Sequence, residues 1–223
     1  FETQDLEDTL SLVILKGNVA DQQITIQSIL NIAEGSAISV EAQVVEGIET
    51  EIVKPVPNAI CYFAYGSNMF TPRLQNRAPD AKRLCNGSLV GYSLKFHKRS
   101  TDGSGKCNIV KTGNQNDIVY GVVFALSVHQ KNLLDVAEGL GKGYHEEILE
   151  VVTDVGLISS NVYIADESAI DESLVPYTWY KAFVVEGAKQ HGLPDGYINE
   201  IDKIQAKEDS DTRRIEKNQK LLR

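Results

Sequence analysis

Short runs of alternating apolar and polar residues occur early in the chain and predict strands. Residues 38–44 (ISVEAQV) and 48–52 (IETEI) both alternate, and an EG pair lies between them. A period of two places the apolar side chains on one face of a strand, so the two runs predict a half-buried hairpin. A PVP sequence at 55–57 then removes two backbone donors, as expected of a stiff linker. We therefore predict a small β-rich module over residues 1–58 that ends in a linker.

Beyond the linker, predicted strands and helices are mixed, and the strands come first. Thr71-Pro72 starts a short helix, because proline is tolerated where a helix N–H has no partner. Most connections between the strands are too short for a helical crossover, which predicts an α+β fold with a mixed, largely antiparallel sheet. Strands are predicted at residues 60–65, 89–97, 108–111, 118–126, 146–152 and 157–164, and later helices at 177–190, at 197–206 and from 210 onward.

One predicted helix has signals at both ends. Ser127 and Gln130 form a capping-box pattern, in which both side chains bond to N–H groups at the start of a helix. Gly139 is a natural stop, so this helix is predicted to end at about Glu138.

The charge is concentrated in one part of the chain and excludes one class of partner. The 223 residues carry a net charge of −9, and residues 1–58 hold ten acidic and two basic side chains. A surface that binds nucleic acid needs a cationic field, so we predict no nucleic-acid partner. For residues 1–58 three interpretations stay open: a solubilising surface, a docking surface for a basic protein partner, or a lid over the rest of the chain.

The sequence offers few candidates for disulfides, metal binding or membrane insertion. Cys61, Cys85 and Cys107 form no CxxC pair, which predicts a cytoplasmic chain without a disulfide framework or zinc knuckle. No apolar run approaches the length of a membrane span, and the start lacks the pattern of a signal peptide. We predict no metal site, because none of the four histidines has a ligand spacing: His97, His129, His145 and His191.

The first candidate for chemistry is a tight turn after a buried strand. Tyr65-Gly66-Ser67-Asn68-Met69 follows the strand at 60–65 and precedes a helix start. Backbone N–H groups converge at such a turn and can bind an anion or an oxyanion. An ordinary turn, in which Ser67 or Asn68 caps the next helix, is the alternative.

Two further segments indicate a function for this turn. AEGLGKGY at 137–144 and GAKQHGLPDGY at 187–197 follow YGSNM in the same order and spacing as in the γ-glutamylcyclotransferase family, which the chain resembles over residues 59–200. The resemblance implies a β-barrel-like core with flanking helices. It also implies release of 5-oxoproline from a γ-glutamyl amine or γ-glutamyl amino acid, without metal, nucleotide or other cofactor.

The implied reaction assigns a role to Glu138. The substrate's own α-amino nitrogen attacks its γ-carbonyl, so the protein must fold the substrate, move protons and stabilise an oxyanion. One carboxylate can remove the proton from the α-ammonium and return it to the departing amine. Glu138 lies at a predicted helix C-terminus, where the dipole disfavours the charged carboxylate. We therefore expect Glu138 to be the general base and acid.

The resemblance also implies a set of substrate-binding residues. Tyr65 would shape the wall, and Tyr144 and Tyr180 match pocket tyrosines of the family, although a core tyrosine with a satisfied hydroxyl is the alternative for both. Many members have leucine at Met69, and the spacing between the glutamate and the next tyrosine varies. The main chain of four residues would hold the γ-glutamyl group: Gly66, Ser67, Asn68 and Met69.

Two readings of the whole chain therefore remain. In the first, residues 59–206 are a catalytic domain and residues 207–223 a charged C-terminal helix or tail. In the second, the same fold is catalytically inactive and binds a ligand or a protein. The identity of the departing amine is not predicted.

Overall fold

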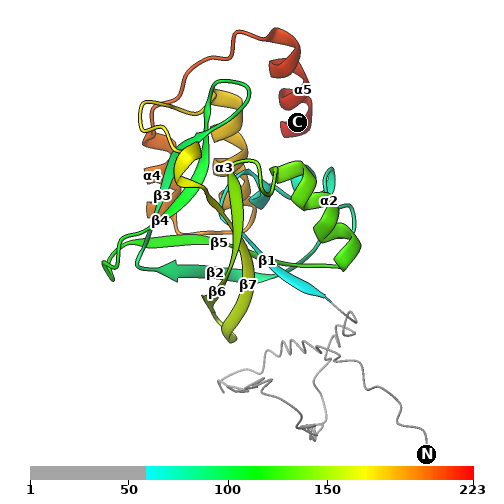
Figure 1. The fold of residues 1–223 in the computed structure, drawn as a ribbon, viewed down its shortest axis with the longest axis vertical. Coiled ribbons are helices and arrows are strands. Elements are labelled where there is room, and N and C mark those ends of the chain that lie inside the picture. The colour runs from blue at the N-terminus through cyan, green and yellow to red at the C-terminus, as the bar shows by residue number, and fades with distance from the viewer. Residues whose placement is uncertain (1–58) are drawn as a thin grey trace, which may run out of the picture. The chain divides into compact units, whose positions relative to one another are not determined.

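The computed structural model describes residues 59–223, which form one compact unit. The predicted hairpin, the linker and the rest of the β-rich N-terminal module lie outside the described residues. Figure 1 shows a strongly curved sheet with helices on its flanks.

Five strands close into a barrel. Their order is β1-β5-β2-β6-β7, and β1 pairs with β7 in parallel, whereas all other neighbours are antiparallel. A further antiparallel pair, β3 (Tyr92–Arg99) and β4 (Gly105–Lys111), forms a separate ribbon. The barrel strands are β1 (Ile60–Ala64), β2 (Lys82–Val90), β5 (Ile118–Leu126), β6 (Tyr144–Thr153) and β7 (Gly156–Ala165).

Helices flank the barrel, so the α+β prediction with a mixed, largely antiparallel barrel-like sheet is confirmed. In Figure 1, α2 lies on one flank, α3 and α4 lie behind the sheet, and α5 leads to the C-terminus. The α-helices are α1 (Thr71–Gln75), α2 (Val128–Glu138), α3 (Thr178–Gln190), α4 (Asp195–Lys203) and α5 (Thr212–Leu222), and two 3₁₀ turns are η1 (Ser67–Met69) and η2 (Glu167–Ala169).

The core joins β1 and β5 to α3. Phe63, Phe124 and Phe183 are almost fully buried, and each comes from one of these three elements. Helix α3 approaches the η1 turn so closely that a Cβ on Gly187 would lie 2.5 Å from the Phe70 nitrogen. Only glycine fits there without a shift of the backbone. The GAK segment of the third motif therefore brings α3 against the YGSNM turn.

One strand prediction was wrong. The run predicted as a strand at 89–97 is divided by a turn at Gly91, where φ is 82°. Strand β2 ends at Val90 and begins at Lys82, seven residues earlier than predicted. Its buried positions alternate, but they include Cys85 and Gly87, whose small side chains hide the period of a strand.

The ends of the helices follow the sequence signals with two differences. Helix α2 ends at Glu138, and Gly139 adopts the left-handed conformation at its C-cap, as predicted. The Ser127 hydroxyl accepts a hydrogen bond from the Gln130 N–H at 3.3 Å, but the Gln130 side chain bonds to Asp80 on another segment instead of completing the capping box. Helix α4 begins and ends earlier than the predicted 197–206.

The last helix is tied to α3 by a buried carboxylate. Asp209 is 4% exposed and accepts a hydrogen bond from the Trp179 indole at 2.8 Å. The Arg214 guanidinium bonds to both carboxylate oxygens and holds the pKa of Asp209 well below its usual range. Asp209, which precedes α5, therefore anchors the charged C-terminal stretch together with the apolar residues of α5 that pack against the core, Ile215, Leu221 and Leu222.

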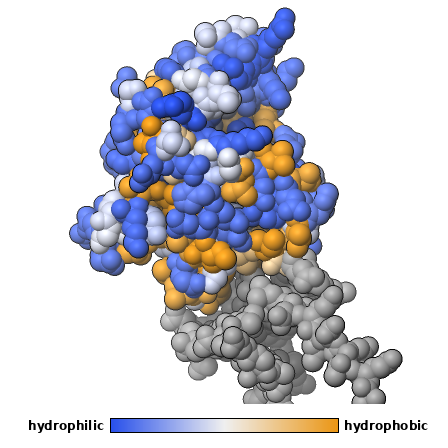
Figure 2. All heavy atoms as spheres, viewed as in Figure 1, coloured by the Kyte–Doolittle hydropathy of each residue, from blue (hydrophilic) through white to orange (hydrophobic). Residues whose placement is uncertain are grey.

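The surface of the described part is mostly polar with local apolar patches. Figure 2 shows such a patch at the lower edge of the coloured surface, where Figure 1 places the turn between β6 and β7. Val152, Val155 and Leu157 are exposed there. Within residues 59–223, no helix has the length and hydropathy needed to cross a membrane.

Candidate active site

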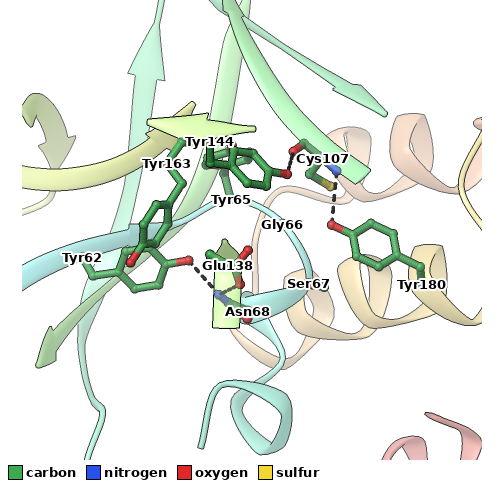
Figure 3. A pocket seen from close by; sticks show the side chains of 10 residues that line it. All are labelled: Tyr62, Tyr65, Gly66, Ser67, Asn68, Cys107, Glu138, Tyr144, Tyr163 and Tyr180. Atoms are coloured by element: carbon green, nitrogen blue, oxygen red, sulfur yellow. Dashed lines mark hydrogen bonds between the residues drawn. The ribbon is translucent and has the colours of Figure 1, made fainter. Parts of the chain in front are cut away.

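A pocket lies where the η1 turn, the end of α2 and the barrel strands meet (Figure 3). About 310 Å³ of space lies between its lining atoms, including the part open to solvent. Five of the ten lining residues are tyrosines, and Glu138 supplies the one carboxylate among them. The lining residues are Tyr62, Tyr65, Gly66, Ser67, Asn68, Cys107, Glu138, Tyr144, Tyr163 and Tyr180.

The pocket brings together most of the residues that the sequence singled out. Tyr65, Gly66, Ser67, Asn68, Glu138, Tyr144 and Tyr180 all line it, although they come from five separate elements or turns. Met69 does not line it: its side chain is fully buried in the core. The structure adds Tyr62, Cys107 and Tyr163, which carry no motif signal and reach the pocket through strand pairing and packing.

The η1 turn offers two free amides to the pocket. The Met69 N–H donates to the Gly66 carbonyl at 2.9 Å and so closes the turn. The N–H groups of Ser67 and Asn68 donate to no acceptor within the described part of the chain. An anion or oxyanion can therefore bind at these two amides.

Side chains from two other segments hold this turn from outside. His191, just after α3, hydrogen-bonds through Nε2 to the Met69 carbonyl at 2.8 Å, and burial lowers its pKa, so it is a neutral donor. Arg73 donates to the Ser67 hydroxyl at 3.0 Å and lies 4.6 Å from the centre of the Phe183 ring. Burial lowers the pKa of Arg73 to about 10, which leaves it cationic at neutral pH. The turn is therefore held in place by contacts within the protein itself.

Glu138 is the last residue of α2, and its carboxylate takes part in a closed set of side-chain contacts. The Asn68 amide nitrogen donates to Glu138 Oε1 at 2.9 Å and to the Tyr62 hydroxyl at 2.9 Å. Arg77 donates through Nη1 to the same Oε1 and, at 2.7 Å, to the Asn68 amide oxygen. The Glu138 side chain is 18% exposed and that of Arg77 22%.

Arg77 is a residue that sequence reasoning missed. It follows α1 and has no motif of its own, but a carboxylate in a pocket calls for a cationic partner, and two arginines follow the YGSN turn closely. In the structure the guanidinium forms an ion pair with the Glu138 carboxylate.

The five pocket tyrosines divide into two groups by what their hydroxyls do. Three donate to protein acceptors: Tyr65 to the Tyr163 carbonyl, Tyr144 to the Cys107 carbonyl at 2.6 Å and Tyr163 to Asp135 at 2.6 Å. Tyr62 and Tyr180 instead accept, from the Asn68 side chain and from the Cys107 N–H at 3.1 Å. No nitrogen or oxygen atom of residues 59–223 accepts their own hydroxyl hydrogens. The Tyr180 hydroxyl also contacts the Cys107 sulfur, which is only a weak acceptor, so both hydroxyls can donate to a ligand.

The remaining ionisable groups of the wall are neutral. Burial raises the pKa of all five tyrosines, and it raises the pKa of the Cys107 thiol to about 12. A neutral thiol is a poor nucleophile. Among the described residues, no three His, Cys, Asp or Glu side chains are grouped as a metal site. Acid–base chemistry at the pocket surface therefore falls to Glu138.

Comparison with known proteins agrees with this geometry. The chain is 31% identical to the γ-glutamylcyclotransferase of Homo sapiens over 164 residues, which cover 70% of this chain and 84% of the human protein. The chain belongs to the γ-glutamylcyclotransferase family. The mouse (Mus musculus) member of the family is 32% identical over 153 residues, 66% of this chain and 79% of the mouse protein.

Two other comparisons show which part of the fold is shared with known proteins. The model of the AIG2-like family matches residues 118–201, a range that runs from β5 to α4 and includes Glu138. A solved structure of a γ-glutamyl cyclotransferase superposes with a TM-score of 0.61 at 28% identity, over 69% of this chain and 92% of that chain. The family resemblance carried by the three motifs is thus confirmed, and the names of the relatives support the prediction that the chain is an enzyme.

Proposed function

We propose that this chain is a γ-glutamyl cyclotransferase, which converts a γ-glutamyl compound into 5-oxoproline and a free amine or amino acid. The observation that carries the proposal is the position of Glu138: its carboxylate faces the same pocket as the free amides of Ser67 and Asn68. A base and an oxyanion site within one small pocket are what an intramolecular attack on a carbonyl requires.

The reaction proceeds in two steps with Glu138 as the proton carrier. Glu138 takes a proton from the α-ammonium of the substrate, and the freed nitrogen attacks the γ-carbonyl carbon. The new N–C bond closes the five-membered ring, and the carbonyl oxygen becomes an oxyanion. Glu138 returns its proton to the departing nitrogen and then takes a second proton from the ring nitrogen, which carries two hydrogens and a positive charge after the attack. The oxyanion reverts to a carbonyl as the bond to the departing nitrogen breaks, and Glu138 passes the second proton to the released amine, which leaves as an ammonium. No water is consumed, and Glu138 ends as it began.

Donors around the pocket fit the negative charge of this pathway. The amides of Ser67 and Asn68 are fixed by the closed η1 turn, so they need no rearrangement when the oxyanion forms. The hydroxyls of Tyr62 and Tyr180 are free to donate to the oxyanion or to the substrate carboxylate. Tyr144 and Tyr65 are wall residues in this proposal, because their hydroxyls donate to the main chain.

A direct assay tests the proposal. The full chain is incubated with γ-glutamyl-alanine, γ-glutamyl-lysine or glutathione, and 5-oxoproline is measured by mass spectrometry. We expect release from at least one γ-glutamyl compound by the wild-type chain and loss of release in Glu138→Gln. Binding of these compounds without turnover by the wild-type chain would favour the catalytically inactive, ligand-binding alternative instead. Full activity of Glu138→Gln would rule out the mechanism but leave the reaction standing.

A further inference from the structure

One cation touches the carboxylate of Glu138 without lining the pocket. Arg77 contacts Glu138 Oε1 and the Asn68 amide oxygen, yet it is not among the pocket residues. We propose that Arg77 is a positioning residue that fixes the orientation of the Glu138 carboxylate and leaves Oε2 for the proton transfers. This inference rests on the proposed cyclotransferase function and adds to it a residue that acts through Glu138.

Hydrogen bonds to Glu138 are unequally shared between its two oxygens. Oε1 accepts from both Arg77 and Asn68, whereas Oε2 accepts no hydrogen bond from any residue that the structure describes. Figure 3 shows the carboxylate in the midst of the tyrosine wall, with Asn68 bonded on one side. A proton from the substrate therefore finds an unoccupied lone pair on Oε2, and Oε1 stays attached to the protein throughout.

The contacts of Asn68 fix which way its side-chain amide faces, so the amide cannot flip. Its amide oxygen must face Arg77, because a guanidinium only donates, and its amide nitrogen must face Glu138, because a carboxylate only accepts. The two contacts of Arg77 thus fix the Asn68 side chain and the Glu138 carboxylate together. Loss of Arg77 frees both to rotate.

The backbone around Arg77 is itself held firmly. The N–H groups of Arg77 and Ala78 both donate to the Leu74 carbonyl, at 2.9 and 2.8 Å, and the side chains of Leu74 and Ala78 are fully buried. The guanidinium is therefore presented from a fixed turn after α1. Such support is expected of a residue that sets the geometry of another group.

Arg77 is also the cation that forms an ion pair with Glu138. The five pocket tyrosines and Cys107 are neutral because burial raises their pKa values. Arg73 and Lys98 are the other cations whose charges act on Glu138, but neither forms an ion pair with it, and burial lowers the pKa of both. Among the described residues, Arg77 is therefore the cation that holds the Glu138 carboxylate by direct contact.

Two variants and one control test this role. Arg77→Gln removes the charge, Arg77→Lys keeps it without the planar fork, and Arg99→Gln removes an exposed arginine of β3 that only approaches Asp171 at 3.8 Å. We expect Arg77→Gln to lower kcat/KM at neutral pH by about 10- to 100-fold, mainly through kcat with KM nearly unchanged. Arg77→Lys should lose about 10-fold in kcat/KM, because an ammonium does not reproduce the two directed bonds. Arg99→Gln should match the wild type.

A second readout does not depend on turnover. In protein labelled with ¹³C at the glutamate carboxyls, comparison with Glu138→Gln assigns the Glu138 signal, and its chemical shift at neutral pH is recorded by NMR. We expect this signal to move in Arg77→Gln, where the carboxylate loses a directed contact at Oε1, and to stay in place in Arg99→Gln. An unchanged Glu138 signal in folded Arg77→Gln overturns the proposal even if the wild type is an active cyclotransferase.

The two proposals fail separately. If the wild type releases no 5-oxoproline, the proposed function is wrong, and the NMR signal of Glu138 still decides whether Arg77 positions its carboxylate. If Arg77→Gln does not fold, as judged by circular dichroism, Arg77→Lys decides: wild-type kcat/KM in that variant contradicts the proposed positioning, and a loss mainly through kcat supports it.

Discussion

Two carboxylates of this chain each bind an arginine, and they differ in how many of their oxygens are occupied. Asp209, before α5, accepts hydrogen bonds on both oxygens, from Arg214 on each, from the Trp179 indole on Oδ2 and from the Asp211 N–H on Oδ1. Glu138 accepts its two described bonds on Oε1 alone. A carboxylate with both oxygens saturated has no lone pair placed to move a proton, so Asp209 anchors α5, whereas Glu138 is available for chemistry.

The difference teaches that an ion pair by itself does not identify a site. Both carboxylates contact a guanidinium, and Asp209 is the more buried of the two residues. What separates them is their surroundings: Glu138 lines the pocket, whereas the Asp209 side chain is fully buried and does not line it. Substitutions at the two positions should therefore affect different properties of the protein.

The largest effect is expected from Glu138→Gln. The amide keeps the size of the side chain but cannot accept the proton of the α-ammonium, so 5-oxoproline release should fall by about 10³-fold. Stability should change little, because one face of the side chain already meets the pocket. Assay of initial rates, together with thermal unfolding, checks both statements. A large loss of stability with residual activity intact would place Glu138 in the same class as Asp209.

Asp209→Asn should show the opposite pattern. The charge-assisted bonds from Arg214 and Trp179 are weakened, and we expect a loss of about 2–3 kcal/mol in the free energy of unfolding. The kcat of the folded variant should equal that of the wild type, because Asp209 does not line the pocket. Urea unfolding followed by Trp179 fluorescence measures the first, and turnover at a temperature well below unfolding measures the second.

The pH dependence of stability separates Asp209 further. Its pKa is lowered in the folded chain, first by Arg214, so its contribution is present above the ordinary aspartate range near pH 4 and is lost as pH falls below it. The stability difference between wild type and Asp209→Asn should thus be constant at neutral pH and shrink in acid below about pH 4. Unfolding curves at several pH values give this difference, and a difference that instead grows in acid would contradict the assignment.

Smaller effects are expected at the tyrosine wall. Tyr62→Phe and Tyr180→Phe each remove a hydroxyl that is free to donate to the substrate, and we expect about a 10-fold loss in kcat/KM for each. Tyr144→Phe removes a hydroxyl bonded to the Cys107 carbonyl and should lower stability by about 1 kcal/mol with less effect on turnover. Equal losses of kcat/KM in all three variants would show that the division of the tyrosines into two groups has no functional meaning.

Local signals in the sequence predicted the elements that hold the site. Strand β5 has the predicted bounds, residues 118–126, because its apolar run is continuous, and α2 ends at Glu138 because glycine follows. The order of the YGSN, EG and GAK segments then led to the family, and the structure brings these three segments together around one pocket and turn. The division at Gly91 was missed, since polar and small residues in β2 obscure its period.

The sequence by itself thus determined the type of most elements and pointed to the YGSN turn and Glu138, because capping, glycine stops and apolar runs act over a few residues. The tertiary structure alone decided which side chains meet. Arg77 and Glu138 are 61 positions apart, Tyr163 and Tyr65 are 98 apart, and Gln130 bonds to Asp80 rather than to its own helix. Such partners depend on how the barrel closes and how α2 packs against it, and no local sequence pattern specifies contacts between residues so far apart in the chain.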